Sequence, residues 1–257
     1  LGCPLRMILR MSAGDISAYV GLVGFVAGIA TGAYFLRKGF SLGRAYTIKK
    51  ENGYAFPLVV AVLFALVIAV PSLYAFSEKG PGSVHAIWYA SLGVGLLFGV
   101  IAQRSRMCFA GSIRDIILLK DFRLFSVVSG IFIVMLVYNL ATNNFKFVAF
   151  GPIAHAQTVW NILSMYAVGF CAVLLGGCPL RQLVLAGTGS SDSVITVLGM
   201  FVGAALAHNF KLAGASAAVE NAAKGIKAAA GGPGLNGQIF VVASIFVLFI
   251  IAFLGLK

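Results

Sequence analysis

Charged residues are scarce in this chain of 257 residues. Only 10% of the residues are charged, with 19 Lys and Arg against 7 Asp and Glu, while 60% are hydrophobic and the mean hydropathy is +1.00. Because a soluble domain carries roughly 25% charged residues, the composition excludes that class and indicates an integral membrane protein. The basic residues that give the net charge of +12 lie between apolar runs, as in the cytoplasmic loops of membrane proteins. We therefore expect a lipid bilayer and not nucleic acid as the partner.

Cysteine and histidine are also few, and their spacing excludes several kinds of site. There are four cysteines and three histidines, with no Cys-x-x-Cys pair and no Cys/His group at zinc spacing. These absences argue against a disulfide framework and a structural metal site. We therefore expect no metal and no cofactor. No cleavable signal peptide is visible, and internal spans can direct membrane insertion.

Seven apolar stretches have the length of membrane-spanning helices. They cover residues 16–36, 56–76, 86–103, 125–141, 159–176, 193–210 and 239–256. Basic residues gather in 37–50 and 104–123, so both loops are predicted on the cytoplasmic side. The sequence therefore predicts an all-α, polytopic helical bundle.

A phrase of five residues occurs twice in the chain. Gly-Cys-Pro-Leu-Arg at 2–6 occurs again 175 residues later at 177–181. At the same offset Gly14, Gly24 and Gly28 align with further glycines. The predicted topology brings the two copies in from opposite faces of the membrane, as in transporters built from inverted repeats. We predict that residues 1–85 form the C-terminal part of a first repeat whose front is missing. Residues 86–257 would form the second repeat, and the chain would be a later part of a longer protein or an incomplete gene model.

The segment that begins at Cys178 predicts a short half-helix. Pro179 suits the first turn of a helix, glycines bracket about nine residues, and nine residues are too few to cross a bilayer. Such a re-entrant helix would place Cys178 at its N-terminus, where the dipole favours a thiolate and small anions, with Arg181 on the same face. The alternative is a buried packing cysteine with an arginine that reaches the interface. Duplication of the whole phrase favours function.

The same chemistry extends to three further places. The first copy offers Cys3, Pro4 and Arg6 in equivalent positions. Cys108 lies at the end of a predicted span between Arg106 and Arg114, another electropositive setting for sulfur. The charges of Arg114 and Asp115 either form an ion pair that fixes a second short helix or are simple loop charges. Cys171, within an apolar run, is interpreted as a packing residue, and Asp192 as the cap of the helix that follows.

These motifs resemble those of a known family. Residues 103–109, followed by Arg114 and Asp115, resemble the signature of the YeeE/YedE membrane proteins, the sulfur-transport family. Residues 176–187, with Asp192, are similar to the YedE branch, which is associated with selenium metabolism. The resemblance implies uptake of a small sulfur or selenium oxyanion through a bacterial inner membrane, past Cys3, Cys108 and Cys178. One departure is that the thiosulfate branch has a Cys-Ala-Ser-Gly type phrase where this chain has Cys-Pro-Leu-Arg. The other is an N-terminal cysteine segment of the family that this chain lacks.

The sequence thus favours a transporter or channel over an enzyme. Its substrate path would consist of Cys3, Arg6, Cys108, Cys178 and Arg181. Supporting roles would fall to Pro4, Pro179, Arg106, Arg114 and Asp115. The alternatives are a membrane thiol redox or sulfur/selenium-relay protein, which passes its cargo to a soluble carrier on the cytoplasmic side, and a scaffold for selenium-handling proteins.

Overall fold

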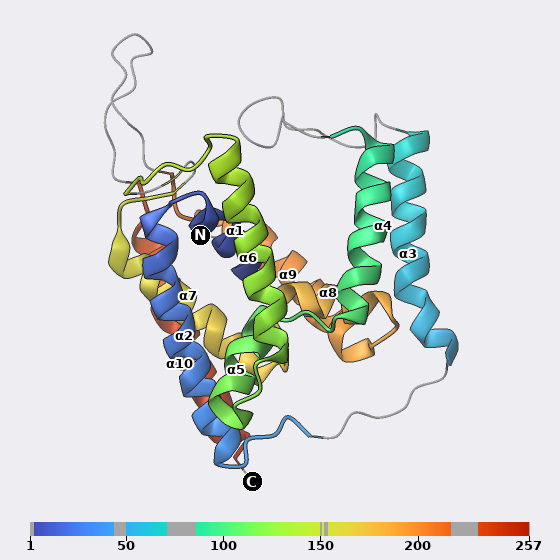
Figure 1. The fold of residues 1–257 in the computed structure, drawn as a ribbon. Coiled ribbons are helices and arrows are strands. Elements are labelled where there is room, and N and C mark those ends of the chain that lie inside the picture. The colour runs from blue at the N-terminus through green and yellow to red at the C-terminus, as the bar shows by residue number, and fades with distance from the viewer. Residues whose placement is uncertain are drawn as a thin grey trace. The chain divides into compact units, whose positions relative to one another are not determined.

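The computed structural model describes residues 3–43, 50–70, 86–149, 151, 154–216 and 231–256. Within these ranges the chain is helical, as predicted, and strand-like pairing is limited to isolated bridges. The helices are α1 (Pro4–Ser12), α2 (Ile16–Arg37), α3 (Lys50–Ala69), α4 (Trp88–Arg104), α5 (Phe109–Leu119), α6 (Arg123–Ala141), α7 (Thr158–Leu174), α8 (Pro179–Gly187), α9 (Ser191–Asn209) and α10 (Leu235–Leu254) (Figure 1).

Six helical segments among the described residues are long and apolar enough to cross a membrane. They are α2, α6, α9, α10 and two composite segments, Trp88–Leu119 (α4 with α5) and Thr158–Gly187 (α7 with α8). A multi-pass membrane protein is therefore confirmed.

The predicted span at 56–76 is shifted. α3 runs from Lys50 to Ala69, and its apolar part, Gly53–Ala69, is shorter than the six spans. The helix ends ahead of Pro71, because the ring of a proline disfavours helical geometry in the residue before it. The end of the predicted span, residues 71–76, lies outside the described residues.

The chain divides into two compact units, which are described separately. One consists of Leu1–Arg44, Cys108–Leu180 and Gly199–Lys257, and the other of Ala45–Met107 and Arg181–Leu198. These units join segments that are distant in sequence. The division into repeats at residue 85 concerns a different property of the chain and stays a prediction.

In the first unit, α2 packs along α7 through glycines (Figure 1). A Cβ added to Gly24 would collide with the carbonyl oxygen of Ile162, and one on Gly28 with that of Tyr166. From the other side, a Cβ on Gly169 would collide with the carbonyl oxygen of Phe25. Small residues at four-residue spacing allow this close approach of membrane helices.

Contacts between aromatic rings show the relative directions of three helices. The rings of Phe35 (α2) and Phe253 (α10) have centroids 5.1 Å apart, and those of Phe170 (α7) and Phe249 (α10) are also 5.1 Å apart. Residues near the C-terminal ends of α2 and α10 thus meet in one cluster with the second half of α7. The three helices therefore run in the same direction.

Helix α6 runs opposite to α2. The side-chain amide of Asn139, near the end of α6, donates to the carbonyl oxygen of Ser12 at 3.0 Å, just before α2 begins. At the other end of α2, the guanidinium of Arg37 donates to the carbonyl oxygen of Ile117 in α5 at 2.6 Å. Arg37 and Ile117, which belong to the two predicted basic loops, therefore lie together at one end of this unit.

The second unit holds α3, α4 and the turn between α8 and α9. A Cβ on Gly189 in that turn would lie 2.9 Å from the carbonyl oxygen of Gly53 in α3. Asp192 lies inside the first turn of α9, which starts at Ser191. It is therefore not the cap that the sequence predicted, although a carboxylate in the first turn still complements the helix dipole.

Candidate functional site

Three short helices begin directly after a cysteine. Cys3 caps α1 and Cys108 caps α5, while Cys178 precedes Pro179, the first residue of α8. Helices α1 and α8 both have nine residues, with proline at the start, as the repeated phrase predicted. In α5 the cysteine is itself the capping group, because the backbone N–H of Gly111 donates to its Sγ at 3.2 Å.

Two of these cysteines meet. The backbone N–H of Cys178 donates to the Sγ of Cys108 at 3.4 Å, although the residues are 70 positions apart. Both are buried, with 6% of Cys108 and 0% of Cys178 exposed. The starts of α5 and α8 therefore converge on one sulfur atom, which accepts an N–H from each helix start. Such a point combines positive helix ends with polarisable sulfur, a setting that suits a small anion.

The third cysteine, Cys3, directly precedes a residue that lines an apolar cavity. Cys3 is exposed, but the residues after Cys3 and Cys108, Pro4 and Phe109, line the same cavity of about 190 Å³. The remaining lining is largely Met, Ile, Leu, Val and Phe from α1, α2, α5 and α6, with Ser112 and Ser129 among them. The starts of α1 and α5 thus open onto one space.

The predicted arginines lie in four different settings. Arg114 pairs with Asp115 at 2.8 Å within α5, which confirms the ion pair that the sequence allowed. Arg181 donates to the side-chain oxygen of Gln103 at 3.1 Å, and this bond ties α8 to α4 in the second unit. Arg6 is exposed on α1. Arg106 is exposed in the turn between α4 and α5, with a left-handed φ of 51°.

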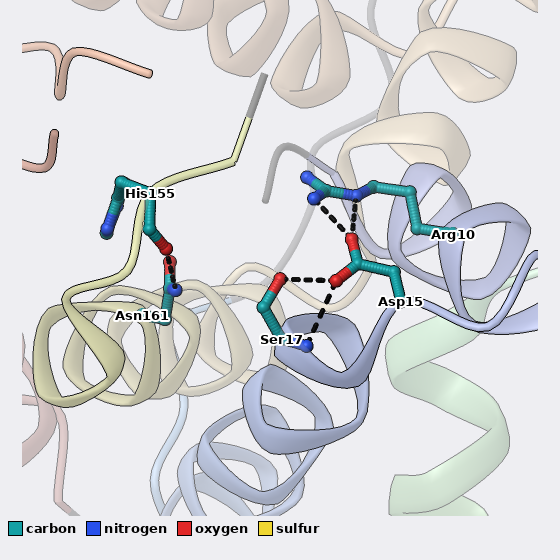
Figure 2. Close-up of polar contacts among 5 residues, drawn as sticks. All are labelled: Arg10, Asp15, Ser17, His155 and Asn161. Atoms are coloured by element: carbon teal, nitrogen blue, oxygen red, sulfur yellow. Dashed lines mark hydrogen bonds and ion pairs between the residues drawn. The ribbon is translucent and has the colours of Figure 1, made fainter. Parts of the chain in front are cut away.

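A buried ion pair that the sequence did not single out joins α1 to α2 (Figure 2). The Nε of Arg10 donates to Asp15 at 2.6 Å, and a second guanidinium nitrogen also faces the carboxylate. The other carboxylate oxygen accepts the N–H of Ser17 at 3.0 Å and its hydroxyl at 2.7 Å, so Asp15 caps α2. An aspartate directly before an apolar helix is a signal that could have revealed the cap. The pair links the end of α1 to the start of α2.

His155 lies close to this pair, ahead of α7. Its carbonyl oxygen accepts the side-chain N–H of Asn161 at 3.4 Å (Figure 2). Its imidazole borders a cavity of about 290 Å³ together with Ser17 and Thr158. Burial lowers the pKa of His155 below its ordinary value of 6.5, and the positive charge of Arg10 lowers this pKa further. The imidazole is therefore neutral at pH 7.

The described residues contain no group of three or more His, Cys, Asp and Glu side chains arranged to hold a metal ion.

The second half of the chain decides its family. Residues 104–257, which include Cys108, α5, Cys178 and α8, match the family model described as sulphur transport. The chain belongs to the sulphur transport family. This confirms the resemblance to YeeE/YedE proteins, and the cysteine pair lies within the matched residues.

One curated relative of this family is the thiosulfate transporter TsuA of Spirochaeta thermophila. It is 32% identical to this chain over 125 residues, which amount to 46% of this chain and 35% of TsuA. The chain thus spans about a third of the length of this curated relative. No solved structure matches the chain.

Proposed function

We propose that the full-length protein transports a small sulfur-containing anion, with thiosulfate as its first substrate, across the bacterial inner membrane. Membership of the sulphur transport family and the similarity to a thiosulfate transporter support a sulfur species as the cargo. The observation that carries the proposal is the hydrogen bond of 3.4 Å from the N–H of Cys178 to the Sγ of Cys108. It brings two helix starts and two buried cysteines together at one point.

The chemistry of this site suits an anion that has shed water. The first N–H groups of a helix have no partner within it, and the dipole adds positive potential at the same end. A thiol donates a weak hydrogen bond through S–H and accepts one through sulfur. Thiosulfate, which carries negative charge on both sulfur and oxygen, therefore exchanges water for N–H and S–H donors. Weak donors at successive points hold the anion without trapping it.

In this account the other predicted residues line or support the path. Cys3 extends the row of thiols at the start of α1, and Arg6 and Arg181 add positive charge along the way. Pro4 and Pro179 fix the first turns of α1 and α8. Supporting roles fall to Arg106, in the turn before α5, and to the ion pair of Arg114 with Asp115 within α5.

The substrate range is proposed to include selenium. The Cys-Pro-Leu-Arg phrase is similar to the branch of the family associated with selenium metabolism, and selenite and selenate are small oxyanions like thiosulfate. A soluble sulfur- or selenium-carrier protein on the cytoplasmic side would then receive the cargo.

Uptake of labelled thiosulfate, selenite and selenate by cells that express the full-length protein tests this proposal. We expect Cys108→Ala and Cys178→Ala to abolish uptake while the protein still reaches the membrane. Cys171→Ala is the matched control, because Cys171 lies half-buried within α7 and away from any helix start. Loss of uptake in the control alone, or in none of the three variants, contradicts the proposal.

A second function is favoured by the same pair of cysteines. Two thiols 70 residues apart in sequence meet in space, and paired cysteines are the usual apparatus of thiol–disulfide exchange. A membrane thiol redox or sulfur-relay protein would use such a pair without moving an anion. Quinone-dependent thiol oxidation by the purified protein, with no accumulation of label in vesicles, would favour this function over transport.

A further inference from the structure

The two copies of the repeated phrase continue into matching structure. Each copy consists of a nine-residue helix that begins at the proline after the cysteine, and then a long helix. These helices are α1 and α2 in one copy and α8 and α9 in the other. The long helices begin at Ile16 and Ser191, at the same offset of 175 as the phrase. The turns between the helices also agree, because Gly14 has a φ of 92° and its equivalent Gly189 a φ of 90°. α2 and α9 are therefore equivalent helices.

Their glycines have different surroundings. On α2, Gly24 and Gly28 lie so close to the backbone of α7 that a Cβ on either would collide with it. The equivalent residues on α9 are Gly199 and Gly203. Apart from the adjoining residues and backbone of α9 itself, no atom of the described residues lies within 4 Å of a Cβ added at these two positions. The same face is occupied in one copy and open in the other.

The position of α7 in the sequence identifies what the open face lacks. α7 ends at Leu174, four residues before Cys178, so α2 packs on the helix that leads into the other copy's cysteine. Two copies related by a two-fold axis make each contact twice, with the roles exchanged. The reciprocal partner of α9 is therefore a helix that leads into Cys3.

We propose that the face of α9 at Gly199 and Gly203 binds an apolar membrane helix in the segment that precedes Cys3 in the full-length protein. The helix packs parallel to α9, as α7 packs parallel to α2. The matched stretch covers 46% of this chain and 35% of TsuA, so that transporter is longer than this chain. The proposal does not depend on the transported substrate.

The contacts of α7 give the register of this helix. Ile162 and Tyr166, which meet Gly24 and Gly28, lie 16 and 12 residues before Cys178. Residues 16 and 12 positions before Cys3 should therefore meet Gly199 and Gly203. Gly169, whose missing side chain admits the carbonyl oxygen of Phe25, lies nine residues before Cys178. The residue nine positions before Cys3 should accordingly be small.

Photo-cross-linking in the full-length protein tests the partner. A benzophenone amino acid replaces Gly203, and mass spectrometry identifies the linked peptide. We expect links around 12 residues before Cys3. Links to lipid only, to α3 or α4, or to a second copy of the chain would overturn the proposal. The same probe at Gly130 of α6, which also has nothing within 4 Å, is the matched control and should link to lipid.

Thermal unfolding of a leucine variant gives a second test of the proposal. Gly203→Leu in the full-length protein should lower the Tm by several degrees relative to Gly130→Leu, because only the first would push a packed helix away. Equal Tm values for the two variants would overturn the proposal.

Discussion

The backbone N–H of Cys178 donates to the Sγ of Cys108 at 3.4 Å, where α5 and α8 begin. This bond brings two separate cysteine phrases together at one buried point. It also places the thiols close enough for their proximity to be tested by chemistry.

Oxidation should join Cys108 and Cys178. With an added small-molecule disulfide, thiol–disulfide exchange would give one protein disulfide and two reduced small thiols. Peptide mass spectrometry should find the Cys108–Cys178 link, while Cys171 stays open to alkylation. A dominant link that involves Cys171, or no link between Cys108 and Cys178 under conditions that oxidise Cys3, would contradict the geometry.

Loss of the carboxylate at Asp15 should destabilise the protein strongly. The side chains of Arg10 and Asp15 are only 13% and 4% exposed, so Asp15→Asn leaves a buried guanidinium without its counter-charge. Breaking a buried pair in this way costs about 3–5 kcal/mol. Thermal unfolding in detergent measures the effect, and the double variant Arg10→Met/Asp15→Asn should recover part of the loss.

An exposed pair provides the control for that experiment. Asp121 and Arg123 are 3.9 Å apart, with side chains 42% and 92% exposed. Asp121→Asn should therefore change stability by less than about 1 kcal/mol. A similar loss in both aspartate variants would show that burial of the Arg10–Asp15 pair is not what matters.

Gly28→Ala should loosen the packing of α2 on α7. Its Cβ would meet the carbonyl oxygen of Tyr166, and extra atoms forced into a tight interface cost about 1–3 kcal/mol. Gly130→Ala on α6 meets nothing within 4 Å and should be neutral or slightly stabilising. Equal thermal stability of the two variants would argue against the close α2–α7 contact.

His155 should make the protein less stable as the pH falls below 6.5. Burial lowers the pKa of this imidazole in the folded state, and positive charge that includes Arg10 adds to the effect. The unfolded state therefore binds a proton first, so the contribution of His155 is complete above pH 6.5 and declines between 6.5 and the lowered pKa. Unfolding curves at several pH values should show a smaller decline for His155→Gln. The same decline in both proteins would assign the effect to other groups.

Local structure was largely predictable from the sequence. Apolar length predicted α2 and α10, and Pro179 predicted the start of α8, because these features depend on neighbouring residues alone. The end of α3 was missed although Pro71 gives a local reason for it. The cap at Asp15 was also missed, despite its position directly before an apolar helix.

Contacts across the chain were not predictable in the same way. The meeting of Cys108 with Cys178 depends on how α7 and α5 pack, which no spacing of residues reports. The partner of Arg181 is a glutamine 78 positions away, and a single sequence contains no signal for that pair. The repeat revealed which helices are equivalent, whereas their different surroundings became visible only in the structure.

Flux of labelled thiosulfate into proteoliposomes that contain the purified full-length protein measures transport past Cys108 and Cys178 without other cell components. Removal of one sulfur contact worth about 1.4 kcal/mol at the limiting step slows flux about tenfold. We expect at least that loss for Cys108→Ala and for Cys178→Ala, with Cys171→Ala close to the unaltered protein. Undiminished flux in the double variant Cys108→Ala/Cys178→Ala would contradict it.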